Sequence, residues 1–326
     1  MKLLTTFCLA AAAMTGAMSA AHAAEPYPSR AIRLLIPFVP GGSTDFIARV
    51  MQPGLSEALG QPIVLDNRPG AAGNIAVEMA ANATPDGHTV LFGNVGAIAI
   101  NPSMFRKLNV QPIRDLACVN ILADVASMMV VHPSIPARSL KEFIDYAKAR
   151  PGKINYGSSS QGSPATLGMQ YFSNKVGLDM VMVAYKGAGA VSTALVSGEV
   201  TAAFVAVPPT VGFVKNGQLR ALVVRSAKRL DLLPEVPSMA EVGFPDLTND
   251  SWQGFFVSAR TPAPIVAQLN AAARKVLADP RAVERFKIGA ATVIDTETPA
   301  KCTAFVKEQT AFWSKLVKQV GLEGSL

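Results

Sequence analysis

The stretch PFVPGGSTDFIARV, residues 37–50, joins an apolar run to an amphipathic one through two glycines and a few small polar or acidic residues. The apolar run 32–39 predicts a buried strand, and residues 45–59 have the spacing of a helix. Glycines let a backbone turn sharply or approach a ligand, and the start of a helix offers free N–H groups to an anion. The stretch is therefore either a tight turn, with Ser43 or Thr44 capping the helix, or a ligand-binding loop.

The same arrangement recurs twice further along the chain. A strand at 62–65 leads through DNRPGAAGN into a helix at 75–83, and a strand at 89–92 leads into GNVGAIAINP. Alternating strands and helices predict a parallel sheet with helices on both faces. The three glycine-rich loops then lie together at the carboxyl ends of the strands, where open α/β sheets bind ligands.

A second unit of the same kind follows an apolar stretch at 119–131. Its loop GSSSQGSP enters a helix with Ser163 expected at the cap and Pro164 at the first helical position. The other elements expected here are a helix at 140–149, strands at 153–156, 180–184, 200–205 and 219–225, and a helix that follows YKGAGA and ends at Gly198. The chain then ends in two helices, which Thr261-Pro262 and Thr298-Pro299 are expected to cap. The pattern predicts an α/β protein with two lobes.

Composition narrows the class of protein. The chain has 326 residues, of which 50% are hydrophobic and 16% charged, with a net charge of +7. Its basic residues are dispersed, and their densest group, Arg225, Lys228 and Arg229, has no interleaved aromatic residues. This argues against a nucleic-acid partner, while a mild positive field suits a small anionic ligand.

Residues 1–24 have the pattern of a cleavable signal peptide. Lys2 precedes an apolar segment, and Ala21-His22-Ala23 has the small residues of a cleavage site. We therefore expect export to the periplasm. No later segment has 18 uninterrupted apolar residues, so no membrane span is expected.

Two cysteines remain beyond this leader, Cys118 and Cys302. They could pair in an oxidising compartment, but two domains of this size do not need the bond. Both lie in apolar patterns, which favours two buried free thiols.

Motifs of catalysis and of cofactor binding are lacking. The sequence contains no GxSxG elbow, GxGxxG fingerprint or P-loop, and neither His88 nor His132 has a neighbouring metal ligand or triad partner. We therefore expect no enzyme, no cofactor and no metal. The alternative is a secreted serine hydrolase or transferase that uses the loop Ser158–Ser160.

The motifs together resemble a known family. YPSRAIRLLIPFVPGGSTDFIAR, LGQPIVLDNRPGAAGNIA, PGKINYGSSSQGSP and SWQGFFVSARTPAPIVAQLN are similar to segments of the tripartite tricarboxylate transporter substrate-binding proteins, or Bug receptors. The resemblance implies a periplasmic binding protein type II-like fold, in which two Rossmann-like lobes are joined by two crossing strands near 119–130 and 251–257. It places residues 25–124 and 250–326 in lobe 1 and residues 125–249 in lobe 2. It further implies a monomer that delivers a small organic carboxylate to a tripartite tricarboxylate-type permease.

The resemblance also implies a ligand site in which loops of both lobes meet. The expected residues are Phe38, Val39, Pro40, Gly41, Gly42, Ser43, Thr44, Asp45, Gly73, Asn74, Asn94, Val95 and Ala97 from lobe 1, and Ser158, Ser159, Gly162, Ser163, Tyr185, Lys186, Gly187 and Val205 from lobe 2. Lys186 either pairs with the anion or is a solvated surface lysine.

The chain departs from many relatives near the far end of this site. It has Val95, Ala97 and Val205 where relatives often carry polar groups. Burying an unpaired polar group beside apolar side chains costs about 1–3 kcal/mol. We therefore expect a ligand with one carboxylate at Gly41-Gly42 and an aromatic or aliphatic body.

Overall fold

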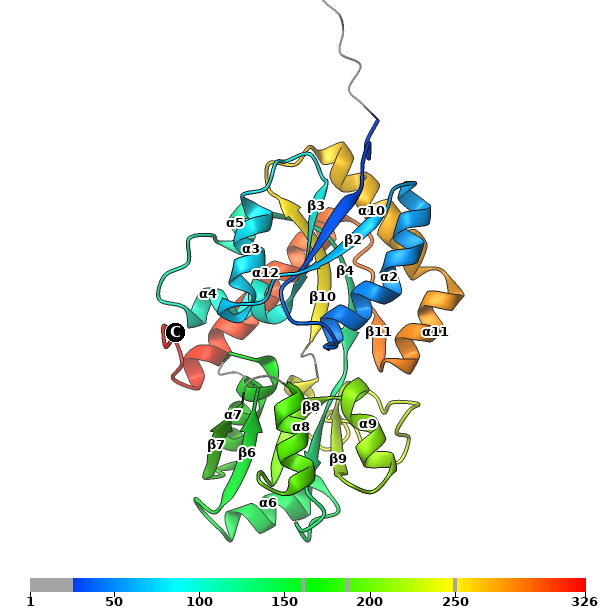
Figure 1. Cartoon of the computed structure of the whole chain (residues 1–326). Coiled ribbons are helices and arrows are strands. Elements are labelled where there is room, and N and C mark those ends of the chain that lie inside the picture. Colours follow the sequence, from blue (N-terminus) through cyan, green and yellow to red (C-terminus); the bar gives the residue numbers. More distant parts are fainter. Residues whose placement is uncertain (1–25, 160–161, 186–187, 249–250) are drawn as a thin grey trace, which may run out of the picture.

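The structure, a computed structural model, describes residues 26–159, 162–185, 188–248 and 251–326, and shows two mixed sheets with helices around each (Figure 1). The strand order of the first sheet is β11 (Ala291–Val293), β4 (Leu116–Val125), β10 (Trp252–Ser258), β3 (Thr89–Asn94), β1 (Ile32–Ile36) and β2 (Ile63–Asn67). β1 is parallel to β2 and β3, as the alternating pattern predicts, whereas β10 runs antiparallel to β3 and β4. We call this sheet and its helices the first lobe.

Helices cover both faces of the first sheet (Figure 1). One face carries α2 (Ser43–Leu59), α10 (Ala263–Leu277) and α11 (Pro280–Ile288); the other carries α3 (Asn74–Ala81), α4 (Asn101–Met104) and α12 (Pro299–Gln319). Short helical segments complete the first lobe: η1 (Ala71–Gly73), the π-helical η2 (Gly96–Ile100) and α5 (Pro112–Asp115). In β1, Leu34 and Ile36 pack into the core beneath α2, and Leu35 packs into the core on the other face. A strand buried on both sides reads as continuously apolar, which is the pattern in the sequence.

The second lobe contains a five-stranded sheet. Its order is β7 (Met180–Ala184), β6 (Ile154–Ser158), β8 (Ala202–Ala206), β5 (Ser127–Val131) and β9 (Arg220–Arg225). Its helices are α6 (Leu140–Lys148), α7 (Pro164–Val176), α8 (Ala188–Ser197), α9 (Val207–Lys215) and the turn η3 (Pro245–Leu247). β6 is parallel to β7 and β8, and β5 is antiparallel to β8 and β9.

The chain passes from the first sheet to the second through Ala126, between β4 and β5. The N–H of Ala126 donates to the carbonyl of Ala290 in the first lobe at 3.0 Å, and its carbonyl accepts from the N–H of Val207 in the second at 3.1 Å. β10 then returns to the first sheet, although residues 249–250, just before it, lie outside the described part of the chain. The lobe boundaries at residues 124 and 250 stay a prediction.

The strand registers show which edges of the two sheets face each other. In the first sheet, Gln253 near the start of β10 pairs with Asn94, the last residue of β3, so β3 ends at the edge where β4 leaves. In the second sheet, Ser127 at the start of β5 pairs with Ala206, the last residue of β8, and β6 and β7 run in the same direction as β8. The carboxyl ends of the parallel strands in both sheets therefore face the crossing.

The observed helix N-caps match those predicted from the sequence in two helices and differ from them in two. The side chains of Ser163 and Thr298 accept hydrogen bonds from the first turns of α7 and α12, as predicted. α2 instead has Gly42 at its N-cap, without a side-chain bond, so the expectation that Ser43 or Thr44 caps it is wrong. α10 has Pro262 at its N-cap, also without such a bond.

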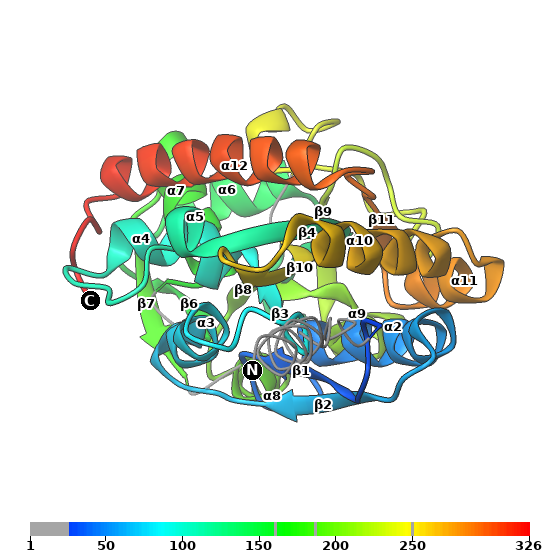
Figure 2. The same ribbon diagram turned by 90° about the horizontal axis from the view of Figure 1, so that it is seen from above.

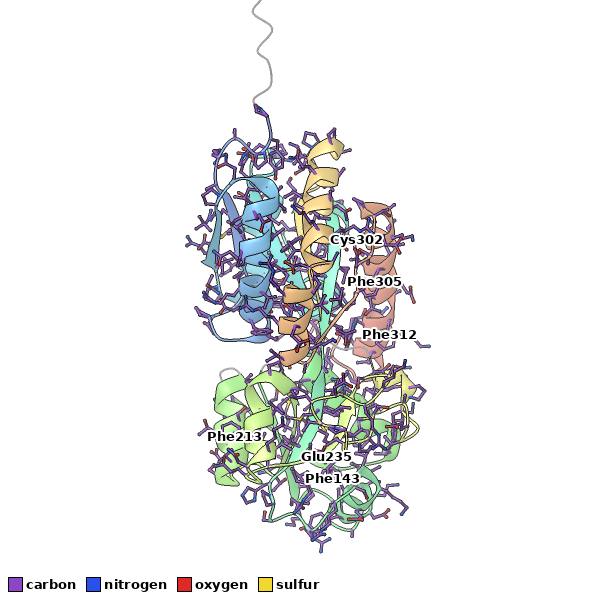
Figure 3. All side chains as sticks on the ribbon, turned by 90° about the vertical axis from the view of Figure 1, so that its right-hand side faces the viewer. Phe143, Phe213, Glu235, Cys302, Phe305 and Phe312 are labelled. Carbon is purple, nitrogen blue, oxygen red and sulfur yellow. A yellow bond between two sulfur atoms is a disulfide. The ribbon has the colours of Figure 1, made fainter. Side chains whose placement is uncertain are left out.

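The expectation of two free thiols is also wrong, because Cys118 and Cys302 form a disulfide. Cys118 lies on β4 of the first sheet and Cys302 lies on α12 (Figure 3). Both cysteines belong to the core between this sheet and α12. Their Cα atoms are 5.7 Å apart, within the range of a disulfide. Their sequence separation of 184 conceals this proximity in the sequence.

Candidate functional site

The loop between β1 and α2 is open around its glycines. Gly41 has φ +91°, a conformation that favours glycine, but Gly42 has φ −83° and ψ 175°, which any residue adopts. A Cβ added at either glycine would meet no atom within 4 Å. Packing within the protein therefore does not require a glycine at position 42, and an approaching ligand gives a reason for one.

The first turn of α2 directs free N–H groups at this opening. The first bond of the helix runs from the N–H of Phe46 to the carbonyl of Gly42 at 2.9 Å. Within the described residues, no protein group accepts from the N–H groups of Ser43 and Thr44. Together with the positive end of the helix dipole, they suit a carboxylate. Val39, 63% exposed, and Pro40 flank the opening.

Asp45 shapes this loop from beneath. Its buried carboxylate accepts hydrogen bonds from the N–H of Gly41 at 3.1 Å and from Arg49 at 2.8 Å and 3.2 Å. Asn67, on β2, donates to Asp45 at 3.4 Å and to the carbonyl of Phe38 at 2.9 Å. Asp45 therefore uses its oxygens within the protein, and its predicted role changes from ligand contact to support of the loop.

These contacts also fix the charge of Asp45. Burial by itself would raise the pKa of Asp45, but the hydrogen bonds from Arg49, Gly41 and Asn67 outweigh it and hold the pKa below its ordinary value of 3.8. Asp45 is therefore an anion at neutral pH, with Arg49 beside it as its counter-ion.

The loop after β2 is held in an unusual backbone conformation. Gly70, Ala71, Ala72 and Gly73 all have positive φ, with 46° at Ala71 and 54° at Ala72. A left-handed conformation costs an L-residue about 1–2 kcal/mol. Strain of this kind is concentrated at functional sites.

Three loops of the first lobe meet at Gly73. A Cβ there would lie 3.1 Å from the Cβ of Ala97, in the loop after β3, and 3.2 Å from the Cβ of Pro37, in the loop after β1. The N–H of Ala97 in turn donates to Oδ1 of Asn94 at 3.0 Å. The prediction that these loops lie together at one edge is therefore confirmed.

Asn101 supports this meeting point and was not predicted from the sequence. Its side chain is 1% exposed, and its Nδ2 donates to the carbonyl of Ala72 at 3.0 Å and to Oδ1 of Asn74 at 2.7 Å. Asn101 thus ties the strained loop to the start of α4. The sequence signal was available, since Asn101 lies at the end of the third glycine-rich stretch, GNVGAIAINP.

The serine-rich loop of the second lobe approaches the same place. A Cβ on Gly162 would lie 3.6 Å from Cε of Met104 and 3.9 Å from Oδ1 of Asn101, both in the first lobe. The structure therefore brings Gly162 close to the loops that carry Asn74 and Gly73.

The serines of this loop are engaged to different degrees. The hydroxyls of Ser158 and Ser163 both bond to that of Thr166, at 2.7 Å and 2.9 Å, whereas Ser159 is half-buried. Tyr185 joins this loop through its N–H, which donates to the carbonyl of Ser158 at 2.8 Å. Burial and then the carboxylate of Glu199 raise the pKa of the Tyr185 hydroxyl. Lys186 and Gly187, also predicted for the site, lie outside the described residues.

The three apolar residues predicted to select the ligand are buried. Val95 and Ala97 are 0% exposed in the core of the first lobe that faces α12, and Val205 is 5% exposed in a core of the second lobe. A ligand can contact them only if the surrounding loops move apart. Their contact with a ligand stays a proposal.

The described residues do not supply the partners that serine catalysis needs. His88 lies at the amino end of β3, opposite the edge where the loops meet. His132 follows the carboxyl end of β5, and its N–H donates to the carbonyl of Thr201, before β8 begins. Ser158 instead ends β6, which runs parallel to β8. Both histidines are thus at the far edges of their sheets.

The described part of the chain shows no metal site and no membrane-spanning helix. It contains no group of three or more His, Cys, Asp or Glu side chains that could hold a metal ion. None of its helices has the length and apolar character needed to cross a membrane. A surface hollow of about 370 Å³ lies on β1 and the edge strand β2, lined by Arg33, Asp66 and Arg68 among others, and includes none of the predicted site residues. β2 and α12 lie on opposite sides of the molecule (Figure 2).

The protein has two lobes whose glycine-rich and serine-rich loops lie at sheet edges that face each other, which is the arrangement of a solute-binding protein. Comparisons with known proteins agree with this class. Residues 47–322 match the family model described as tripartite tricarboxylate transporter family receptor. Protein BugT of Bordetella pertussis is 33% identical over 308 residues, which cover 94% of each chain. The chain therefore belongs to the tripartite tricarboxylate transporter receptor family, a family of solute-binding receptors and not of enzymes.

Solved structures extend this agreement. Rpa4515 of R. palustris, solved with adipate, has a TM-score of 0.84 and 32% identity over 90% of this chain and 98% of its own. MatC of Rhodopseudomonas palustris, solved with malate, has a TM-score of 0.80 and 29% identity over 89% of this chain and 100% of its own. The predicted fold class, two α/β lobes of the periplasmic binding protein type, is therefore confirmed.

Proposed function

We propose that this protein is a periplasmic receptor that binds a small organic carboxylate in a cleft between its lobes and delivers it to a tripartite tricarboxylate-type permease. The ligand has an aromatic or aliphatic body and places one carboxylate over Gly41 and Gly42. The protein acts as a monomer and is exported by the signal peptide of residues 1–24, which lie outside the described part of the chain.

The observation that carries this proposal is the loop at the start of α2. It combines N–H groups that are unpaired within the described residues, the positive end of a helix dipole and a glycine that internal packing does not require. Two relatives whose structures hold adipate and malate support the carboxylate class. Hydrogen bonds from backbone N–H groups to a carboxylate contribute about 1.5–3 kcal/mol each, enough for a receptor without a paired lysine or arginine.

The second lobe completes the site by covering the ligand. Ser159, Gly162 and Ser163 approach from the loop after β6, and Tyr185 follows β7; the predicted contribution of Lys186 lies outside the described residues. The position of Gly162 beside Asn101 supports this arrangement. The alternative of a serine hydrolase has no support, since His88 and His132 lie at the far edges of their sheets.

Native mass spectrometry of the freshly purified protein, followed by calorimetry with a panel of carboxylates, tests the proposal. We expect a bound organic anion, and tighter binding of benzoate-like acids and of fatty dicarboxylates than of citrate or aspartate. The opposite ranking would contradict the apolar body of the ligand. Failure of every carboxylate to bind would contradict the proposed function itself.

A further inference from the structure

Gln253 on β10 is a buried amide to which the described part of the chain offers no hydrogen-bond partner. It is 0% exposed, and within the described residues no protein group bonds to its Nε2 or its Oε1. An unpaired buried polar group is destabilising, and such groups are nearly always paired in folded proteins. The side chain therefore calls for a partner from outside the chain.

The strand register places this amide on the α2 side of the first sheet, at the edge that faces the second lobe. Gln253 is directly opposite Asn94, and residues paired in this way project to the same side of a sheet. The next pair on that side, Phe255 and Phe92, has ring centroids 5.3 Å apart and lies in the core beneath α2. Trp252 projects to the opposite side, where its Nε1 donates to Gln309 of α12 at 3.1 Å.

Asn94 gives this position a second donor. Its Oδ1 accepts from the N–H of Ala97, which leaves its Nδ2 available. Gln253 and Asn94 are therefore paired neighbours at the carboxyl edge of the sheet, and because the Gln253 side chain is 0% exposed, a ligand reaches it only when the surrounding loops move apart, as for Val95 and Ala97. β3 separates β10 from β1, and since adjacent strands lie about 4.8 Å apart, Gln253 is about 10 Å across the sheet from the end of β1.

We infer that Gln253, together with Asn94, binds a hydrogen-bond-accepting oxygen at the far end of the ligand and so determines which carboxylates the receptor accepts. This inference rests on the proposed function, because it requires the near carboxylate to occupy the start of α2. The ligand then has an apolar body with an acceptor oxygen at each end. Gln253 acts as a specificity residue that the sequence motifs did not indicate.

Calorimetry with matched acids tests this inference. The probes are the linear diacids from succinate to suberate and terephthalate, each beside a monoacid of the same size, with the wild-type protein and Gln253→Leu. A hydrogen bond to a charged group contributes about 1.5–3 kcal/mol, so the wild type should prefer its best diacid over the matched monoacid by roughly 10-fold to 100-fold. Gln253→Leu should lose this preference and bind the monoacid about as the wild type does.

Gln309→Leu is the matched control, because it removes a second buried glutamine that contacts β10 from the opposite side. It should lower the melting temperature, since Trp252 Nε1 loses its acceptor, and should keep the diacid preference. Gln253→Leu should melt at the wild-type temperature or above it, because two unpaired atoms are removed. A lower melting temperature with an unchanged preference would mean that Gln253 is purely structural.

The remaining outcomes separate the inference from the proposed function. A wild-type protein that binds monoacids as tightly as diacids overturns the inference and leaves the proposed function standing. A Gln253→Leu variant that keeps the full diacid preference does the same. A wild-type protein that binds neither series overturns both.

Discussion

The backbone N–H of Gly41 donates a hydrogen bond to Oδ2 of Asp45, 3.1 Å away, so a side chain from the first turn of α2 closes the loop that precedes the helix. Arg49, one turn further along, holds the same carboxylate in place. The shape of the loop thus depends on an anion that lies beneath it, while its exposed side stays free for a ligand.

Asp45→Asn should destabilise the empty protein by about 1–3 kcal/mol at neutral pH, because it removes a charged acceptor from Gly41 and Arg49. This destabilisation should become smaller as the pH falls. The pKa of Asp45 is lowered in the folded state, so its contribution is fully present above the ordinary, unfolded pKa of 3.8 and is lost as the pH falls through the lower folded pKa.

Thermal unfolding of both proteins between pH 3 and pH 7 measures this dependence. The gap in melting temperature between wild type and Asp45→Asn should be constant from pH 7 to pH 5 and should narrow below about pH 4. A gap that widens with acidification would show that the charge of Asp45 does not stabilise the loop.

Gly42→Val should abolish ligand binding while the empty protein melts within a few degrees of the wild type. A Cβ at position 42 meets no protein atom within 4 Å and the backbone is ordinary, so the empty protein should still fold, but the valine side chain should fill the space above the N–H groups of α2. Calorimetry and a melting curve provide the measurement.

Gly212→Val is the control for Gly42→Val, because Gly212 is exposed on α9 and its added Cβ also meets no atom within 4 Å. It should retain full binding. If Gly42→Val unfolds the protein, or if both variants bind normally, Gly41-Gly42 is only a tight turn.

Periodicity in the sequence predicted most of this fold because local patterns encode it. β7 spans Met180–Ala184 as predicted, and α2 ends at Leu59 with Gly60 in the left-handed conformation. α11 and β11 were missed, since α11 follows α10 after two residues and β11 has only three. α9 was also missed, because Pro208 and Pro209 at its start read as a loop.

The site was predictable only where a motif marks it. The glycine-rich loops are visible in the sequence, and their meeting at Gly73 follows from parallel strands. The role of Gln253 is not visible, because it depends on the pairing of β10 with β3 across almost half of the chain. The disulfide is concealed for the same reason, since it joins β4 to α12.

Reduction of the disulfide between Cys118 and Cys302 should lower the free energy of unfolding by about 2–4 kcal/mol, because the bond closes a very long loop in the unfolded chain. Denaturant titration with and without dithiothreitol measures the difference. The double variant Cys118→Ala, Cys302→Ala should be insensitive to the reductant. Two titratable thiols in the unreduced, denatured protein without residues 1–24 would show that the bond does not form.

Ala71→Gly combined with Ala72→Gly should leave the empty protein as stable as the wild type or raise its stability by about 1 kcal/mol. Glycine removes a strain of about 1–2 kcal/mol at each left-handed position, against an entropy cost of about 0.5–1 kcal/mol. Affinity for a carboxylate should fall, because the loop that Asn101 holds through the carbonyl of Ala72 becomes less rigid.

Ala76→Gly serves as the control for this prediction. Ala76 is fully buried in α3 and has no positive φ, so the same change should cost about 1 kcal/mol there. Denaturant titration of the three proteins, with calorimetry for binding, distinguishes the two cases. If the change at Ala71 and Ala72 lowers stability as much as Ala76→Gly does and leaves affinity intact, the left-handed backbone is an ordinary turn without a role in holding the ligand.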